Sequence, residues 1–252
     1  MNRSIIMDLS TTTHELTTVN TLPDIVYLET YLKRHKYYGT VTLIKGDSAI
    51  SDHIKRDAIW EEFMLKYFEK NYVPNTDVID IGAYIGLHTI ALSKIVSNKC
   101  TVHAFEPQKQ VFDILEKNSN KKIKNYHLGV SDKSKTRKYV TNLNNGNPGG
   151  KTLIHNDENG ESVDLVNLDL LKFERRISLI KIDCEGDEIN VLKGGINLIK
   201  KDKPIIICEI AGGMNRDHPI TLNSLNRMKE ILKEINYEME KISFHDYLLT
   251  PC

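Results

Sequence analysis

Five short apolar runs, separated by segments of helical periodicity, most constrain what this chain can fold into. They are VIDI (78–81), TVHAF (101–105), NYHLGV (125–130), LIKID (179–183) and PIIICEI (204–210). Runs this short and this continuous in Val, Ile and Leu are typical of parallel strands buried on both faces of a sheet. The alternation therefore predicts an α/β fold, a Rossmann-like parallel sheet with helices on both faces.

The segment before the first run predicts an additional element. Residues 1–56 show no strong period and are expected to form an N-terminal cap on a domain that spans 57–252. At the start of that domain, apolar residues recur at helical spacing from Ile59 to Phe68. This spacing predicts a helix that covers one face of the sheet and whose aromatic side chains belong to the core.

Two later segments depart from the simple alternation. The run 142–150 is rich in Asn, Gly and Pro, so we expect a long loop that shapes a substrate pocket. Near the end, residues 222–235 predict an amphipathic helix, and 237–242 with 245–250 predict an antiparallel hairpin.

The charge balance limits the partners. Lys+Arg and Asp+Glu both total 34, so the formal net charge is zero, which argues against a broad basic face for nucleic acid. The densest positive runs, 121–124 and 199–203, adjoin apolar segments and are expected to be solvated edges. We therefore expect neither a nucleic-acid partner nor a membrane partner.

The cysteines indicate a reducing compartment. Cys100, Cys184, Cys208 and Cys252 stand singly and form no Cys-x-x-Cys pair, so neither a zinc knuckle nor a disulfide scaffold is expected. The sequence contains no signal-peptide pattern and no apolar stretch near the ~20 residues of a membrane span. We therefore expect a soluble, cytoplasmic protein.

A glycine turn follows the first run and indicates the kind of cofactor. The dinucleotide fingerprint reads Gly-x-Gly-x-x-Gly, whereas this turn reads Asp80-x-Gly82-x-x-x-Gly86, one residue longer and with a carboxylate first. A pyrophosphate favours bare backbone amides, but a strand-end carboxylate can help to bind a cationic, amino-acid-bearing sulfonium. The turn, with Ala83 and Tyr84, is therefore expected to bind S-adenosylmethionine. Both glycines should let the backbone approach it closely, and Gly86 also suits close helix packing.

The next two strand ends extend this predicted site. Glu106 stands twenty residues after Gly86, and its carboxylate can accept hydrogen bonds from both hydroxyls of a ribose. Ser131 and Asp132 end the third run and are expected to meet the edge of an adenine. Together the three strand ends predict a nucleoside site, and the glycine spacing favours S-adenosylmethionine over a dinucleotide.

These motifs resemble those of the FkbM family of S-adenosylmethionine-dependent O-methyltransferases. The similar segments are VIDIGAYIGLHTIALSK, VHAFEPQ, GVSD and ISLIKIDCEGDEINVLKGG, and the likeness runs from about residue 59 to the end. Cys184 and Asp187 depart from the residues usual in the family. The resemblance implies a class I, seven-stranded methyltransferase sheet with a C-terminal hairpin. It also implies methyl transfer to a hydroxyl, frequently of a sugar in a glycan or natural product. The expected partner is therefore a small-molecule or glycan acceptor, and whether the protein forms a homo-oligomer stays open.

The fourth and fifth runs end in carboxylates that can serve such a reaction. Methyl transfer to a hydroxyl requires an aligned acceptor and a group that takes its proton. Asp183 and Glu209 end neighbouring strands, with Glu185 beside them. An alternative role for Asp183 is a helix N-cap. Two carboxylates at adjacent strand ends repel unless a cation or hydrogen-bond donors lie between them, so Asp183 and Glu209 are also candidate ligands of Mg²⁺ or Mn²⁺.

Other assignments stay open. His218, in the segment after the fifth run, is the alternative general base. An N-methyltransferase acting on nucleic acid or protein is an alternative activity, although Asp-Cys-Glu-Gly stands at 183–186 where such enzymes need an Asn-Pro-Pro-Tyr-like turn. A non-catalytic partner subunit with a methyltransferase fold is a third interpretation, which the retained strand-end acids disfavour. A nucleotide-sugar oxidoreductase does not fit the glycine spacing.

Overall fold

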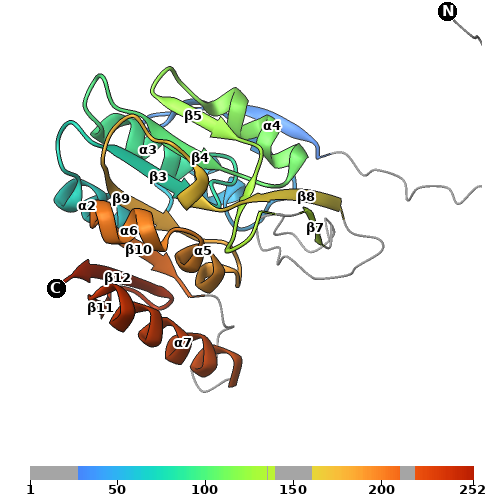
Figure 1. Ribbon diagram of the computed structural model, residues 1–252. Helices are drawn as coiled ribbons and strands as arrows, with labels where there is room; N and C mark the ends of the chain where they lie inside the picture. Colours follow the sequence, from blue (N-terminus) through green and yellow to red (C-terminus); the bar gives the residue numbers. More distant parts are fainter. Residues whose placement is uncertain (1–27, 135, 140–160, 211–218) are drawn as a thin grey trace, which may run out of the picture.

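The computed structural model describes residues 28–134, 136–139, 161–210 and 219–252, and its main element is a seven-stranded sheet (Figure 1). The strands are β3 (Asp77–Ile81), β4 (Val102–Phe105), β5 (Ile123–Tyr126), β9 (Ile177–Ile182), β10 (Ile205–Glu209), β11 (Tyr237–Lys241) and β12 (Asp246–Pro251). Their order is β11-β12-β10-β9-β3-β4-β5. The chain runs outward from β3 in one direction and returns to the other side through β9. The order therefore reverses between β3 and β9, where ligands bind in sheets of this kind.

Strand direction completes the topology. The five central strands are parallel to one another, and β12 is antiparallel to both β10 and β11. The predicted C-terminal hairpin is thus confirmed, with its second strand inserted between the first and the parallel strands. This arrangement confirms the predicted α/β methyltransferase sheet.

Helices cover both faces of the sheet. They are α2 (Glu62–Asn71), α3 (Leu87–Ile95), α4 (Lys109–Asn118), α5 (Glu188–Gly194), α6 (Ile196–Asp202) and α7 (Pro219–Ile235). One core joins α2 and α3 to the sheet through Phe68, Leu92 and Leu179. Another joins α5 and α7 to the opposite face, and it includes Ile180 and Leu192. Alternate residues of β9 thus enter different cores, which explains why the central strands are continuously apolar.

The helix predicted from Ile59 begins later. Glu61 has a left-handed backbone, with φ of 41°, so α2 starts at Glu62. Ile59 and Trp60 consequently precede the helix and are free to face other elements.

The described part of the cap is a hairpin and a short helix. It consists of β1 (Thr30–His35), β2 (Gly39–Ile44) and α1 (Ser51–Lys55). Leu43 of the hairpin shares a core with Ile90 of α3 and Ile114 of α4. The Asn118 side chain, at the end of α4, accepts from the Thr42 amide at 2.6 Å and donates to the Thr42 carbonyl at 3.0 Å. The cap therefore packs directly against α3 and α4, while the boundary at residue 56 stays a prediction.

The third predicted strand is divided, which corrects the prediction of one run over 125–130. Strand β5, at the edge of the main sheet next to β4, ends at Tyr126. Residues Gly129–Val130 form β6, which joins β7 (Thr136–Tyr139) and β8 (Glu161–Val166) in a small separate sheet, followed by a 3-10 helix over Leu168–Leu170. A Cβ on Gly129 would lie 2.5 Å from Leu165 Cδ2, so the missing side chain permits the close pairing of β6 with β8. The run 142–150 lies outside the described residues.

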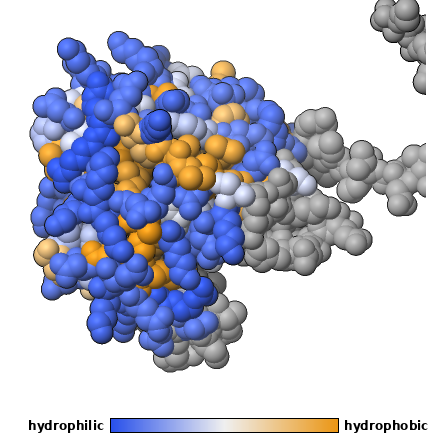
Figure 2. All heavy atoms as spheres, in the orientation of Figure 1, coloured by the Kyte–Doolittle hydropathy of each residue, from blue (hydrophilic) through white to orange (hydrophobic). Residues whose placement is uncertain are grey.

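The surface and the thiols follow the composition. On the face drawn in Figure 2, hydrophilic residues dominate and hydrophobic residues gather in a band across the middle. All four cysteines lie in the described part of the chain and are free. None of the helices in the described ranges combines the length and the apolar character needed to cross a bilayer.

Candidate active site

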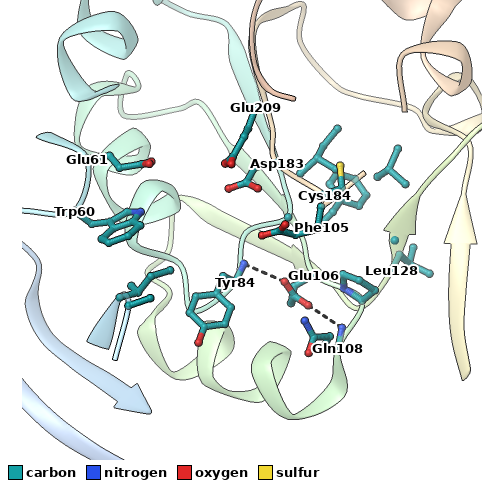
Figure 3. A pocket seen from close by; sticks show the side chains of 18 residues that line it. Trp60, Glu61, Tyr84, Phe105, Glu106, Gln108, Leu128, Asp183, Cys184 and Glu209 are labelled. Carbon is teal, nitrogen blue, oxygen red and sulfur yellow. Dashed lines mark hydrogen bonds between the residues drawn. The ribbon is translucent and has the colours of Figure 1, made fainter. Parts of the chain in front are cut away.

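A cavity opens at the carboxyl ends of β3, β4, β9 and β10, next to the reversal of strand order (Figure 3). Its walls come from the cap, from the turn after β3, and from the segments after β4, β9 and β10. It is lined by Ala49, Ile50, Trp60, Glu61, Ile81, Gly82, Tyr84, Phe105, Glu106, Pro107, Gln108, Leu128, Gly129, Val130, Asp183, Cys184, Glu185 and Glu209.

Glu106 is held rigidly at one side of this cavity. Its Oε2 accepts from the Tyr84 amide at 3.0 Å and its Oε1 from the Gln108 amide at 2.8 Å (Figure 3). Tyr84 is left-handed, with φ of 51°, and this turn of the backbone brings its N–H to the carboxylate. A carboxylate at this position can accept hydrogen bonds from the hydroxyls of a ribose diol.

The glycines of the turn are required by packing. Gly82 lines the cavity, has φ of 76°, and a Cβ there would lie 1.6 Å from the Asp183 carbonyl oxygen. Gly86 precedes α3 with φ of 90°, and its Cβ would lie 2.7 Å from Leu115 Cδ1. The contact of Gly86 with Leu115 of α4 agrees with the close helix packing expected there, whereas Gly82 both lines the cavity and makes room for the Asp183 carbonyl. Ala83 is buried between them, away from the lining.

Five of the predicted cofactor residues are absent from this lining, namely Asp80, Ala83, Gly86, Ser131 and Asp132. Asp80 is fully buried behind the turn and accepts from Thr89 Oγ1 at 2.6 Å. Ser131 is also fully buried, and its hydroxyl donates to Asp187 Oδ2 at 3.0 Å. Asp132 follows it outside the lining. The chain lines the cavity at residues 128–130, just after β5 ends at Tyr126.

The other end of the cavity is acidic. Figure 3 shows the carboxylates of Asp183 and Glu209 side by side, with Glu61 facing them from the start of α2. Glu185 lines the same end. Burial, followed by the charge of Asp183, raises the pKa of Glu209 to about 9. Burial is also the main cause that raises the pKa of Glu61 and of Glu185 to about 7, so these carboxyl groups hold protons more readily than usual.

A buried lysine, which the sequence analysis missed, lies behind the acids. Lys181 in β9 donates to Asp183 Oδ2 at 3.0 Å and lies 3.9 Å from Asp80 Oδ1. Burial lowers its pKa, but Asp183, Asp80 and Glu61 outweigh that effect and the net pKa is raised. A lysine within an otherwise apolar, doubly buried strand was the signal that could have revealed it, because an unpaired charge is too costly there.

Lys181 removes the reason for expecting a metal. The repulsion between strand-end carboxylates called for a cation or for hydrogen-bond donors, and for Asp183 this cation is a lysine ammonium. Within the described ranges, no group of three His, Cys, Asp or Glu side chains is arranged to hold a metal ion. The assignment of Asp183 and Glu209 as metal ligands is therefore not supported, and His218 lies outside the described residues.

The cap supplies a wall of the cavity. Ala49 and Ile50 line it next to Trp60, which was predicted to be a core residue. Asp47 fixes this segment: it accepts from the Ile50 amide at 3.1 Å and from the Tyr84 hydroxyl at 3.2 Å. Tyr84 therefore contacts Glu106 through its amide and the cap through its hydroxyl.

The sheet order, the glycine turn and the carboxylate after the second parallel strand together define a class I methyltransferase fold. The model of the methyltransferase FkbM domain matches residues 80–239, and the chain belongs to this family. A model of protein-L-isoaspartate(D-aspartate) O-methyltransferase also matches, over residues 8–140.

Individual relatives are distant. The hexuronic acid methyltransferase AglP of Haloferax volcanii is 26% identical over 184 residues, which cover 71% of this chain and 74% of that protein. The crystal structure of methyltransferase FkbM from Methylobacillus flagellatus is 18% identical with a TM-score of 0.47. That match covers 74% of this chain and 50% of the other, so the chain spans half the length of that structure. The putative methyltransferase SMU.1697c of Streptococcus mutans, solved in complex with SAH, is 12% identical with a TM-score of 0.42, and the match covers 75% and 94% of the two chains.

Proposed function

We propose that this protein is an S-adenosylmethionine-dependent O-methyltransferase whose acceptor is a sugar hydroxyl. The observation that carries the proposal is the position of Glu106, held by two backbone amides in a cavity that leads to Asp183. Glu106 would hold the ribose, Leu128 and Val130 would flank the adenine, and the backbone at Gly82 would lie along the amino-acid part. When bound, the cofactor supplies a methyl group activated by a sulfonium.

The acidic end supplies what a hydroxyl acceptor needs. Asp183 takes the acceptor proton, since it is the carboxylate that the Lys181 ammonium directly pairs. The raised pKa of Glu209 favours its protonated form. In this form Glu209 donates a hydrogen bond to another oxygen of the sugar that receives the methyl group. Ala49, Ile50 and Trp60 form the apolar side of the acceptor position, so the cap helps to choose the acceptor. The sugar assignment is supported by family membership and by the relative named for hexuronic acid.

Cofactor binding is tested by Glu106→Gln. We expect the variant to lose a charge-assisted contact to the ribose and S-adenosylmethionine affinity to fall by about 1.5–3 kcal/mol, roughly 10- to 150-fold. Isothermal titration calorimetry with S-adenosylmethionine and S-adenosylhomocysteine measures this, with Asp113→Asn, a carboxylate on the surface of α4, as the matched control. Equal affinity of the two variants would remove Glu106 from the cofactor site.

The charge of the cavity predicts which sugars are accepted. Glu61, Glu106, Asp183, Glu185 and Glu209 line it, and among the described lining residues there is no Lys, Arg or His. A carboxylate on the acceptor would meet the like charge of the Asp183 carboxylate that receives the proton, so we expect kcat/KM for a neutral hexoside to exceed that for the matching hexuronate at least tenfold. A methyl-transfer screen with mass detection, over free, nucleotide-linked and glycan-linked sugars, checks this expectation.

The same screen also tests for N-methylation of a sugar amine. Carboxylates around the acceptor position also suit a protonated amine, so a hexosamine belongs in the panel together with its N-acetyl form. Methylation of the hexosamine nitrogen, located by NMR of the product, would contradict O-methylation. The cytoplasmic location stays a prediction from the isolated cysteines.

A further inference from the structure

A chain of buried polar contacts connects α3 to the acidic end of the cavity. Thr89 Oγ1 donates to Asp80 Oδ2 at 2.6 Å, Asp80 Oδ1 lies 3.9 Å from Lys181 Nζ, and this nitrogen donates to Asp183 Oδ2 at 3.0 Å. The side-chain exposures are 0% for Asp80, 5% for Lys181 and 28% for Asp183. The first two groups are thus fixed inside the protein, and only the third reaches the cavity.

The geometry favours Asp183 over Asp80 as the hydrogen-bond partner of the lysine. The 3.0 Å distance to Asp183 is that of a charge-assisted hydrogen bond, whereas 3.9 Å to Asp80 is an ion pair without one. Asp80 therefore compensates the buried charge, and the directed N–H of Lys181 fixes Asp183. With Oδ2 engaged, Oδ1 is the oxygen that Asp183 can present to an acceptor.

Lys181 also distinguishes Asp183 electrically from the acids around it. Several other carboxyl groups interact electrostatically with Asp183 or Lys181, among them Glu61, Asp80, Glu185, Glu188, Glu209 and Asp246. Lys181 donates its hydrogen bond to Asp183, so the ammonium nitrogen lies closer to this carboxylate, at 3.0 Å, than to Asp80, at 3.9 Å.

We infer that Lys181 is a positioning residue: it holds Asp183 as an oriented carboxylate whose Oδ1 receives the acceptor proton. This inference rests on the proposed function and goes beyond it. In the reaction, an electron pair of the acceptor oxygen forms the bond to the methyl carbon, and the sulfur retains the pair of the broken bond. The hydroxyl proton passes to Asp183 Oδ1 and then to solvent, and Lys181 stays protonated throughout.

Comparing the double variant Asp80→Asn/Lys181→Met with Asp80→Asn tests whether Lys181 positions Asp183 or only neutralises Asp80. Lys181→Met alone leaves Asp80 buried without its cation and is expected to fold poorly. The double variant Asp80→Asn/Lys181→Met has no such buried charge. The single variant Asp80→Asn keeps the lysine hydrogen bond to Asp183 and is the matched control.

We expect the double variant to have a kcat at least 100-fold below that of Asp80→Asn, while Asp80→Asn stays within tenfold of the wild type. Affinity for S-adenosylmethionine should be similar in the two variants, because neither altered group lines the cavity. Their melting temperatures should also be similar, because neither variant leaves Asp80 buried as a charge without its cation. If the double variant turns over within threefold of Asp80→Asn, Lys181 merely neutralises Asp80 and the inference is wrong.

Crystal structures of the two variants provide a second test of the inference, and this test needs no methyl acceptor. Asp183 should keep its orientation in Asp80→Asn and lose it in the double variant, and an unchanged carboxylate in both would also overturn the inference. Failure of the wild type to bind S-adenosylmethionine would instead contradict the proposed function. The two failures are therefore distinguishable.

Discussion

Replacing Gly82 with alanine is expected to abolish stable folding. A Cβ at this position would lie 1.6 Å from the carbonyl oxygen of Asp183 and 2.8 Å from its carbonyl carbon. Both are backbone atoms next to the end of β9, so no side chain can move aside to make room. The turn after β3 and the segment after β9 would have to separate, and we expect a loss of about 4 kcal/mol or more of unfolding free energy.

Gly39→Ala is the matched control for this prediction. Gly39 has φ of 83°, close to the 76° of Gly82, but nothing lies within 4 Å of its missing Cβ. Its substitution carries only the cost of the left-handed backbone, about 1–2 kcal/mol. Thermal and denaturant unfolding of both variants should therefore separate the collision from the backbone cost. Similar stabilities for the two would show that the contact with Asp183 relaxes without penalty.

Asp183→Asn is expected to reduce turnover by roughly 10²- to 10⁴-fold, the range for the loss of a general base. Asparagine keeps the size of the side chain and can still accept from Lys181, but it cannot take the acceptor proton. Cofactor affinity should stay within a few-fold, because Glu106 lies on a different wall of the cavity. Single-turnover methyl transfer and calorimetry measure the two quantities separately.

Glu209→Gln provides the comparison at the neighbouring strand end. Because the pKa of Glu209 is raised to about 9, this group is mostly protonated near pH 7 and glutamine imitates its neutral form. We expect a loss of turnover of less than about tenfold at this pH, against the much larger loss in Asp183→Asn. A reversed order, with Glu209→Gln the more damaging change, would assign proton abstraction to Glu209.

The sequence by itself determined the sheet and much of the cavity edge. Continuous apolar runs such as VIDI and PIIICEI can be stable only as strands covered on both sides, so the parallel sheet followed from local pattern. Since carboxyl ends of parallel strands share one edge, Glu106, Asp183 and Glu209 had to lie near one another. The antiparallel hairpin was equally local, because both of its strands are adjacent in the chain.

Only the tertiary structure decided which strand-end residues face the cavity and what balances their charges. Asp80 occupies a strand-end motif, yet the packing of α3 turns it toward Thr89 and Lys181, away from the cavity. Lys181 lies within an apolar run, and its pairing depends on β3 and β9 being neighbours although about a hundred residues separate them in the chain. Such contacts between distant segments leave no local pattern. Their energies depend on burial and on distance, which arise only when the chain has folded.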